Sequence, residues 1–252
     1  MDSFNNKAIA ITGGASGMGL ALAKYIASRG GRVSIADVQE NALNQAVDAL
    51  AKVASLGSSA VLARQVDVRK TDQVDSWIEE TKRTFGQLNG AANLAGISGR
   101  MGIDPIVDQK DDDWEFVMGV NATGLMYSLR AELRAITPGG SIVNASSSFV
   151  FKAGPTFAPY TASKHAVIGL SQCAAREVGA QGTRINCVAP GPVNTPMFHG
   201  TSGINEKALA SMSAVQRIGE PEEVAALIAF LLGDESKYIT GAVYIIDGGL
   251  GI

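Results

Sequence analysis

The stretch KAIAITGGASGMG, residues 7–19, decides the fold. Its first half is a run of small and branched apolar residues, which favours a buried strand, and its second half crowds glycines into a turn. The residues that follow, up to Gly30, place apolar side chains at helical spacing. A strand, a glycine turn and a helix in direct succession predict the first unit of a parallel α/β sheet.

The alternation of strand and helix patterns continues along the whole chain. Further strands are expected at 32–37, 60–67, 90–96, 139–147, 183–190 and 241–247, with helical patterns between them. We find no Pro/Ser-rich linker and no repeat, so residues 1–252 are expected to form one domain. The sequence therefore predicts an α/β fold, a single doubly wound Rossmann-type domain whose seven-stranded parallel sheet carries helices on both faces.

Composition excludes several classes of function. The net charge is −3 and no Lys/Arg cluster occurs, which argues against a nucleic-acid partner. No apolar run is long enough for a membrane span or a signal peptide, so we expect no membrane contact and a cytoplasmic location. Cys173 and Cys187 and the two histidines lack metal-ligand spacing, so no metal site is expected.

The glycines of the first turn suit the binding of an anion. Gly13, Gly17 and Gly19 permit a tight turn and let the backbone approach a pyrophosphate closely. The helix that begins here would point its free N–H groups and positive dipole end at the same anion. A glycine cluster alone is compatible with a plain loop, but here it lies between a strand and a helix, as a dinucleotide site requires.

Asp37 ends the second predicted strand, 18 residues after Gly19. A carboxylate at this place can accept hydrogen bonds from both adenosine-ribose hydroxyls and repels a 2′-phosphate. Neither Ala15, Ser16 nor Val38 supplies a basic side chain that would attract such a phosphate. The residue is also compatible with a helix cap or a loop charge, but next to the glycine turn it favours NAD(H) over NADP(H).

Tyr160 and Lys164 lie four residues apart in APYTASKHAV, residues 158–167. This spacing places both on one helix face, which is compatible with a solvated surface or with proton chemistry. Hydride transfer from an alcohol to a nicotinamide also releases a hydroxyl proton, so a bound dinucleotide favours the second interpretation. A phenol with a pKa of about 10 is a weak base at neutral pH. We expect the Lys164 ammonium to lower the pKa of Tyr160 and so make it a general acid/base.

With these motifs the chain resembles the short-chain dehydrogenase/reductase family, over nearly its whole length. The matching segments are TGGASGMG (12–19), VDV (66–68), NLAG (93–96), VNATG (120–124), ASSS (145–148), YTASK (160–164) and PGPVNTPM (190–197). The resemblance implies an NAD(P)-dependent alcohol dehydrogenase or carbonyl reductase.

The resemblance also implies which residues act. The catalytic set carried over to this chain is Asn121, Ser147, Tyr160 and Lys164. The residues implied to bind the coenzyme are Gly13, Ser16, Gly17, Met18, Gly19, Asp37, Val38, Asp67, Val68, Asn93, Ala95, Gly96, Tyr160, Lys164, Pro190, Gly191, Val193 and Thr195.

Two places depart from the family pattern. Leu94 stands where the family has a second Asn that ties neighbouring strands together, which puts the local backbone bonding in doubt. Three consecutive serines make the catalytic serine ambiguous. The family spacing to the tyrosine selects Ser147, and Ser146 or Ser148 remain alternatives.

Asn121 lies inside a predicted helix, residues 113–135, where Asn has a poor propensity. In the family the equivalent residue helps to hold a water that links the lysine to solvent. The alternative is a buried Asn that satisfies only backbone groups.

Substrate contacts are expected from the loops after the fourth, fifth and sixth strands, residues 97–106, 148–159 and 193–219. The last is long and contains Gly, Ser and Thr, which suits a lid. The side chains expected to line an apolar cavity are Met101, Phe149, Phe151, Phe157, Met197 and Phe198. They favour a fairly bulky hydrophobic alcohol or ketone, and Arg100 and Lys152 are candidates for contact with a carboxylate.

The leading interpretation is an NAD(H)-dependent oxidoreductase that interconverts a secondary alcohol and a ketone. The alternatives are an NADP(H)-dependent carbonyl reductase, another reaction on the same scaffold such as dehydration, and a dinucleotide-sensing protein without turnover. The retained Asn–Ser–Tyr–Lys set favours catalysis. The family also implies a homo-oligomer, a tetramer or a dimer, formed through helices near 113–135 and 159–180.

Overall fold

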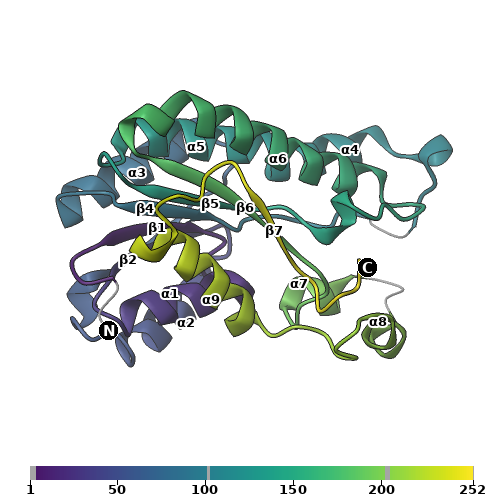
Figure 1. The fold of residues 1–252 in the computed structure, drawn as a ribbon, viewed down its shortest axis with the longest axis horizontal. Coiled ribbons are helices and arrows are strands. Elements are labelled where there is room, and N and C mark those ends of the chain that lie inside the picture. The colour runs from purple at the N-terminus through teal and green to yellow at the C-terminus, as the bar shows by residue number, and fades with distance from the viewer. Residues whose placement is uncertain (1–3, 101–102, 202–204, 252) are drawn as a thin grey trace.

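The computed structural model describes residues 4–100, 103–201 and 205–251, and its strands form one parallel sheet (Figure 1). Within these residues the sheet has seven strands in the order β3-β2-β1-β4-β5-β6-β7. The strands are β1 Ala8–Thr12, β2 Arg32–Asp37, β3 Val61–Gln65, β4 Gly90–Asn93, β5 Ser141–Ala145, β6 Arg184–Pro190 and β7 Val243–Ile246. The predicted fold is confirmed, and each strand lies within the range that the sequence indicated.

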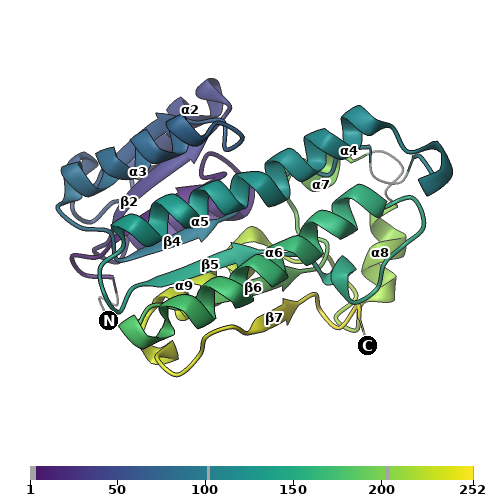
Figure 2. The same cartoon turned by 90° about the horizontal axis from the view of Figure 1, so that it is seen from above.

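Helices cover both faces of this sheet. One face carries α1 Gly17–Ala27, α2 Glu40–Ala51 and α9 Pro221–Leu232, and the other carries α3 Thr71–Phe85, α5 Gly124–Ala135 and α6 Ala158–Val178 (Figures 1 and 2). Three further helices lie towards the carboxyl ends of the strands: α4 Asp111–Met118, α7 Pro196–Gly200 and α8 Glu206–Met212. The connections at this end of the sheet therefore build any site that the fold offers.

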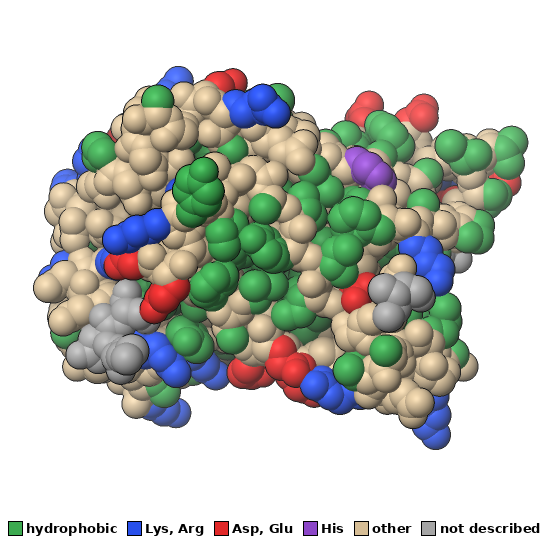
Figure 3. Space-filling view, in the orientation of Figure 1, with side chains coloured by type: hydrophobic (Ala, Val, Ile, Leu, Met, Phe, Trp, Pro, Cys, Tyr) green, Lys and Arg blue, Asp and Glu red, His purple; other side chains and the backbone are tan. Residues whose placement is uncertain are grey.

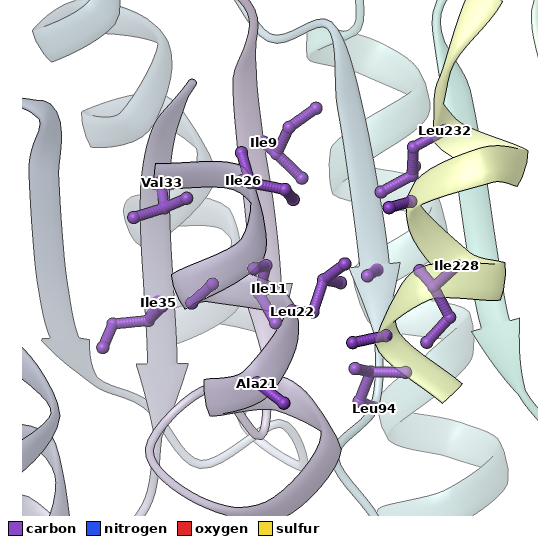
Figure 4. Close-up of a cluster of buried hydrophobic side chains, with 14 of the residues drawn as sticks. Ile9, Ile11, Ala21, Leu22, Ile26, Val33, Ile35, Leu94, Ile228 and Leu232 are labelled. Atoms are coloured by element: carbon purple, nitrogen blue, oxygen red, sulfur yellow. The ribbon is translucent and has the colours of Figure 1, made fainter. Parts of the chain in front are cut away.

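The alternation of side chains along β1 explains the two hydrophobic layers. Ile9 and Ile11 point into the layer beneath α1 and α9, whereas Ala10 belongs to the layer on the opposite face. The side chains that meet in the first layer are drawn in Figure 4: Ile9, Ile11, Ala21, Leu22, Ile26, Val33, Ile35, Leu94, Ile228 and Leu232. Both faces of the sheet are thus buried, as a purely parallel sheet requires.

The strand order reverses beside β1. β1 pairs with β2 on one side and with β4 on the other, so the chain that leaves β1 turns away from the chain that leaves β4. Thr12, the last residue of β1, is level with Ala36 of β2 and Asn93 of β4. The loops diverge here and open a crevice, which is where ligands bind in this architecture.

The helix predicted at 113–135 is interrupted. Between α4 and α5 the backbone forms a π turn, Gly119–Thr123, in which the chain accommodates one extra residue. Asn121 lies in this turn and is buried. The helix predicted at 113–135 is present as α4 and α5 with this turn between them, and Asn121 in the turn contacts the loop after β4 and α6, as described below.

The described ranges, 4–100, 103–201 and 205–251, show neither a membrane span nor a metal cluster. No helix there combines the length and the apolar character needed to cross a bilayer. No group of three His, Cys, Asp or Glu side chains in the same ranges is arranged to hold a metal ion.

Candidate active site

The glycine turn after β1 is closed to side chains. Gly13 and Gly17 have φ values of 66° and 49°, which L side chains rarely adopt. A Cβ at Gly19 would lie 2.1 Å from the Gly13 carbonyl oxygen. α1 begins at Gly17 with no acidic residue in its first turn, and Ser16 makes no side-chain cap. The first N–H groups of α1 are therefore open to an anion, which fits a pyrophosphate.

A cleft of about 240 Å³ opens in front of this turn. It is lined by residues from the ends of β1, β2, β3 and β4 and by the loop after β6. The predicted coenzyme residues among them are Gly13, Ser16, Gly17, Met18, Gly19, Asp37, Val38, Asp67, Val68, Ala95, Gly96 and Thr195. Positions scattered over the sequence thus line one cleft of a size that suits a ligand.

Asp37 faces the glycine turn across the cleft. Its Oδ2 accepts a hydrogen bond from the Ala15 N–H at 3.3 Å, and its Oδ1 accepts one from the Gln39 N–H at 3.1 Å. The carboxylate is thus held by backbone donors at the cleft wall rather than left as a free loop charge. This is the position from which a carboxylate can meet the ribose hydroxyls of a dinucleotide.

Arg69 and Phe116 line the cleft and were missed by the sequence analysis. The Arg69 Nη2 lies 2.6 Å from Asp67 Oδ2, and its Nε donates to both oxygens of the same carboxylate. Hydrogen bonds from Arg69 hold the pKa of Asp67 below its usual value. The guanidinium also lies 5.0 Å from the centre of the Phe116 ring. The sequence offered one indication of this contact: a basic residue, Arg69, stands two positions after Asp67.

Six predicted coenzyme residues do not line this cleft: Tyr160 and Lys164, described below, and Asn93, Pro190, Gly191 and Val193. Asn93 directs its amide into the core. Pro190 is buried at the end of β6, and the Gly191 N–H donates to the Ile246 carbonyl. Val193 lines a separate cavity of about 190 Å³ next to Asp247. Their roles in coenzyme binding stay predictions.

Tyr160 and Lys164 share one face of α6. The Lys164 Nζ lies 5.6 Å from the centre of the Tyr160 ring and donates a hydrogen bond to the Ala145 carbonyl at 2.9 Å. Lys164 is buried and Tyr160 is half-buried. The solvated-face interpretation therefore does not describe this pair.

The pKa values of this pair differ from the expected pattern. Burial raises the pKa of Tyr160, and a hydrogen bond with the Ser147 side chain opposes this increase. Burial also lowers the pKa of Lys164 to about 8. The prediction that Lys164 lowers the pKa of Tyr160 is wrong for the protein alone, because loss of solvent disfavours the charged form of each group. Tyr160 is accordingly a neutral phenol at neutral pH.

The three serines after β5 make different contacts. Ser147 lies close enough to the Tyr160 hydroxyl to lower its pKa, and its Oγ accepts from the Phe149 N–H at 3.3 Å. Ser146 instead donates to the Lys164 carbonyl at 2.9 Å, and Ser148 begins a short 3-10 turn. Of the three serines, Ser147 is the one that affects the pKa of Tyr160, which is consistent with the predicted choice.

Asn121 bridges the π turn to the loop after β4. Its Oδ1 accepts from the Ile97 N–H and its Nδ2 donates to the Ile97 carbonyl, both at 2.9 Å. Its Nδ2 also donates to Ser163 Oγ at 3.0 Å. A Cβ at Gly96 would lie 3.3 Å from both Asn121 Oδ1 and Lys164 Nζ. Asn121 is therefore tied mainly to backbone, yet its oxygen and the ammonium approach the same point at the cleft wall.

The substitution at Leu94 leaves the backbone bonded. The Thr12 hydroxyl accepts from the Leu94 and Ala95 N–H groups at 3.2 and 3.3 Å. The tie between strands comes from Asn93, which donates to Asn144 on β5 at 2.9 Å. The Leu94 side chain packs in the core beneath α1 and α9 (Figure 4). The doubt raised by the departure from the family pattern is thereby removed.

Aromatic rings stand beside Tyr160. Phe149 stacks on Phe157 with ring centres 4.8 Å apart and meets the Tyr160 ring edge-on at 6.2 Å. Met197 lines the cleft, and Phe151 is exposed.

The remaining substrate expectations have mixed outcomes. Arg100 forms an ion pair with Asp104 at 2.9 Å, so its guanidinium already has a carboxylate partner. Lys152 is exposed. Met101 and residues 202–204 of the expected lid lie outside the described residues. The rest of that segment contains α7 and α8.

Comparisons with known proteins cover nearly the whole chain. A family model described as Enoyl-(Acyl carrier protein) reductase matches residues 13–251. The chain is 47% identical over 253 residues to Short-chain dehydrogenase/reductase aba4 of Botryotinia fuckeliana (strain B05.10), covering 98% of this chain and 97% of that protein. It is 34% identical over 249 residues to Cyclohexanol dehydrogenase of Acinetobacter sp. (strain SE19), covering 98% and 96%. The solved structure of a short-chain type dehydrogenase/reductase from Mycobacterium ulcerans has a TM-score of 0.93 at 30% identity, covering 99% of this chain and 91% of that one.

Proposed function

The chain belongs to the short-chain dehydrogenase/reductase family, whose members use an NAD(P) coenzyme, and we propose that it is an NAD(H)-dependent oxidoreductase that interconverts a secondary alcohol and a ketone. The observation that carries the proposal is the group formed by Tyr160, Lys164 and Ser147 beside the cleft. Tyr160 is the general acid/base, Ser147 and Lys164 assist it, and Asn121 positions the loop around them.

The preference for NAD(H) rests on the charges at the β2 end of the cleft. Asp37 presents a carboxylate there, which repels the 2′-phosphate of NADP(H). Ala15, Ser16 and Val38 carry no positive charge. Among the described residues that line the cleft, Arg69 is the cation, but Asp67 occupies it through a bidentate ion pair. Glycines packed too closely for a Cβ leave room for the pyrophosphate at the start of α1.

The residues handle the proton, while the bound nicotinamide supplies or accepts the hydride. In reduction, the neutral Tyr160 phenol donates its proton to the oxygen of the new alcohol. In oxidation, Tyr160 must accept that proton as a phenolate, and the positive charges of Lys164 and of the oxidised coenzyme favour this form. The Ser147 hydroxyl stabilises charge on the substrate oxygen. Burial raises the pKa of Tyr160 in the protein alone, and a positively charged coenzyme in the cleft would lower it.

We propose a bulky hydrophobic substrate. Ile97, Phe116 and Met197 add apolar side chains to the lining of the cleft, and Phe149 and Phe157 stack beside Tyr160. The relative named Cyclohexanol dehydrogenase acts on a cyclic secondary alcohol, which is consistent with this chemistry. The segment 193–219, which carries α7 and α8, would close over the substrate as a lid.

We also propose that the protein is a homo-oligomer. Hydrophobic side chains gather across the middle of the face where β7 and α9 lie (Figure 3). Phe230, Tyr238 and Ile245 are large apolar side chains that the described structure leaves exposed. A second copy would cover such a surface, and analytical ultracentrifugation measures the assembly.

The test of the function is a coenzyme and substrate screen. The protein is assayed with NAD⁺ and with NADP⁺ against cyclohexanol, bulkier cyclic secondary alcohols and straight-chain primary alcohols, and reduced coenzyme is followed by absorbance. NAD⁺-dependent oxidation that is fastest with cyclic secondary alcohols is expected. Tight coenzyme binding without turnover of any alcohol or ketone would show a sensing protein instead.

A further inference from the structure

Two phenylalanines join the two ends of the loop between β5 and α6. Phe149 stands at the start of this loop, two residues after Ser147, and Phe157 stands at its end, three residues before Tyr160. Their rings stack with centres 4.8 Å apart and an angle of 23° between the planes. We call Phe149 and Phe157 the aromatic pair. This contact closes the loop that separates the serine from the tyrosine.

The loop is shaped so that the two rings can meet. Gly154 has no side chain, and a Cβ at this position would lie 3.0 Å from Cδ2 of the Phe157 ring. Thr156, the residue before Phe157, has a φ of 66°, which residues with a side chain rarely adopt. Such a conformation persists only where the surrounding structure holds it in place. The chain therefore accepts local strain where it brings Phe157 onto Phe149.

Phe149 contacts both residues on which the proposed chemistry depends. Its N–H donates to Ser147 Oγ at 3.3 Å, and its ring meets the Tyr160 ring edge-on, with centres 6.2 Å apart. Because Ser147 Oγ accepts a hydrogen bond from the backbone, its own proton is free to be donated elsewhere. Phe149 therefore links the serine on the β5 side of the loop to the tyrosine on the α6 side.

Phe157 is the residue from which α6 begins. It is the N-cap residue of this helix, and its carbonyl accepts the Thr161 N–H at 2.9 Å. Tyr160 lies in the first turn of α6, so its position follows that of the helix start. The aromatic pair therefore ties the start of the helix to the residue that follows Ser147 in the short 3-10 turn.

The hydrogen bonds that join α6 to the end of β5 stop before Ser147. Lys164 Nζ donates to the Ala145 carbonyl, and the Ser146 hydroxyl donates to the Lys164 carbonyl, both at 2.9 Å. Ser147 is the next residue along the chain. Among the described residues, the hydrogen bond that Ser147 Oγ accepts comes from the Phe149 N–H. The stacked ring of Phe149 therefore fixes the N–H that orients the Ser147 side chain.

We propose that Phe149 and Phe157 are positioning residues that hold the Ser147 hydroxyl in place beside Tyr160. The proposal rests on the proposed function, in which Tyr160 exchanges the substrate proton and Ser147 stabilises charge on the substrate oxygen. Because both groups act on the same oxygen atom, a displacement of about 1 Å between them is enough to slow the reaction strongly. Loss of the aromatic pair should therefore lower kcat, whereas loss of a side chain that only lines a substrate cavity should raise KM.

The Ser147 side chain also affects the ionisation of Tyr160. Burial raises the pKa of Tyr160, and the nearby Ser147 side chain opposes this increase. Lys164, with its pKa lowered to about 8 by burial, lies 5.6 Å from the centre of the Tyr160 ring. If Ser147 moved away, the pKa of Tyr160 would rise further.

The other titratable side chains on and around α6 are exposed, paired or neutral. On α4 they are partly or fully exposed: Asp111, Asp112, Asp113 and Glu115. On α6 itself they are exposed: His165, Cys173, Arg176 and Glu177. On β6, Arg184 donates to the Gly233 carbonyl at 2.9 Å, and burial raises the pKa of Cys187 to about 11, so this thiol is neutral at pH 8. β5, the π turn and the 3-10 turn carry no titratable side chain.

The first test is the kinetics of Phe149→Leu, which keeps an apolar side chain and removes both ring contacts. In alcohol oxidation kcat should fall about tenfold with KM little changed, and equally for propan-2-ol and cyclohexanol, because the defect lies in geometry and not in the fit of the substrate. The rise of kcat/KM with pH should move to higher pH, since this profile reports the free enzyme. Phe149→Tyr keeps the ring and should restore kcat and the profile.

A double-mutant cycle shows whether Phe149 acts through Ser147. In a Ser147→Ala background, Phe149→Leu should change kcat by less than about twofold, because no serine hydroxyl is left to displace. Independent effects of the two substitutions, or a loss confined to KM and larger for cyclohexanol, would overturn the proposal. If Phe149→Leu does not fold, Phe157→Leu replaces it in the same cycle, because it removes the stack and leaves Phe149 in place.

Phe4→Leu is the matched control for the loss of an aromatic contact. Phe4 meets Tyr25 edge-on with ring centres 6.4 Å apart, and neither residue lines the cleft. This substitution should lower the melting temperature and leave kcat unchanged. A loss of kcat in Phe4→Leu as large as in Phe149→Leu would attribute both to reduced stability and so contradict a positioning role.

A second measurement does not depend on turnover. The protein is labelled with 3-fluorotyrosine, and the fluorine NMR signal of Tyr160 is assigned from its absence in Tyr160→Phe. Phe157→Leu should shift this signal, because Phe157 supports the Phe149 ring that contacts Tyr160. An unchanged Tyr160 signal would overturn the proposal. A wild type that binds NAD⁺ but oxidises no alcohol would refute the proposed function and leave this comparison decisive for the aromatic pair.

Discussion

The two ends of the cleft are built in different ways. At the coenzyme end the backbone forms the surface: a Cβ at Gly13 would lie 2.8 Å from the Ala95 nitrogen, and one at Gly19 would lie 2.1 Å from the Gly13 oxygen. At the proposed substrate end side chains form it: Met197 lines the cleft and is exposed, and α7, which carries it, has open space around Gly200. Added side chains at Gly13 or Gly19 would therefore clash with backbone, whereas a side chain at Gly200 would not.

Tyr160 lies between the two ends, and removing its hydroxyl should have the largest effect on kcat. Tyr160→Phe should lower kcat by ~10²–10⁴ or more, because the variant lacks the hydroxyl that we propose exchanges the substrate proton. NAD⁺ affinity, measured by fluorescence titration, should stay within a few-fold of wild type. Near-normal turnover in this variant would contradict the proposal that Tyr160 is the general acid/base.

The free energy of unfolding should depend on pH because Glu132 is a fully buried carboxyl. The pKa of Glu132 is raised from 4.5 to about 7 in the folded state, so the folded state binds this proton more tightly than the unfolded state. Its contribution is complete below pH 4.5 and is lost as the pH rises through 7, by about 3 kcal/mol. Urea unfolding should therefore show that Glu132→Gln gains about this much relative to wild type between pH 5 and pH 8. A constant difference across this range would contradict the raised pKa.

A matched pair of glycine substitutions compares the two ends directly. Gly19→Ala should cost about 1–3 kcal/mol of coenzyme binding or stability, because the added methyl overlaps the Gly13 carbonyl. Gly200→Ala, in α7 at the substrate end, meets nothing within 4 Å and should leave both unchanged. Calorimetric titration with NAD⁺ and thermal melting measure the two variants side by side. Equal effects would erase the distinction.

Coenzyme choice should respond to charge more than to shape. Asp37→Asn keeps the size of the side chain and removes the repulsion of a 2′-phosphate, together with charged hydrogen bonds to the ribose. The ratio of kcat/KM for NAD⁺ over NADP⁺ should fall about 10-fold or more, since hydrogen bonds to charged groups contribute about 1.5–3 kcal/mol. An unchanged ratio would mean that the coenzyme end discriminates by another group, and Arg69 would be the next to replace.

The same contrast explains how much the sequence could predict. The strands, the glycine turn and Asp37 follow from local patterns, because hydrophobic period and glycine content act within a few residues of themselves. Arg69 and Phe116 come together only through the fold, since they are 47 positions apart in the chain. Glu132 gave no local signal either, because its burial depends on Asn93 of another element. The raised pKa of Tyr160 could not be predicted either, because it depends on how deeply the side chain is buried, and residue spacing gives no information on burial.

The π turn at Gly119–Thr123 is equivalent to one residue inserted into an otherwise continuous rod. Deleting a single residue there would let α4 and α5 merge into a regular helix with better internal bonding. The same deletion would rotate Asn121 away from Ile97, and the helix would lose its hydrogen bonds to the loop after β4. We expect this deletion to raise the melting temperature and to lower kcat. The π turn is therefore a site where stability and activity place opposite demands on the sequence.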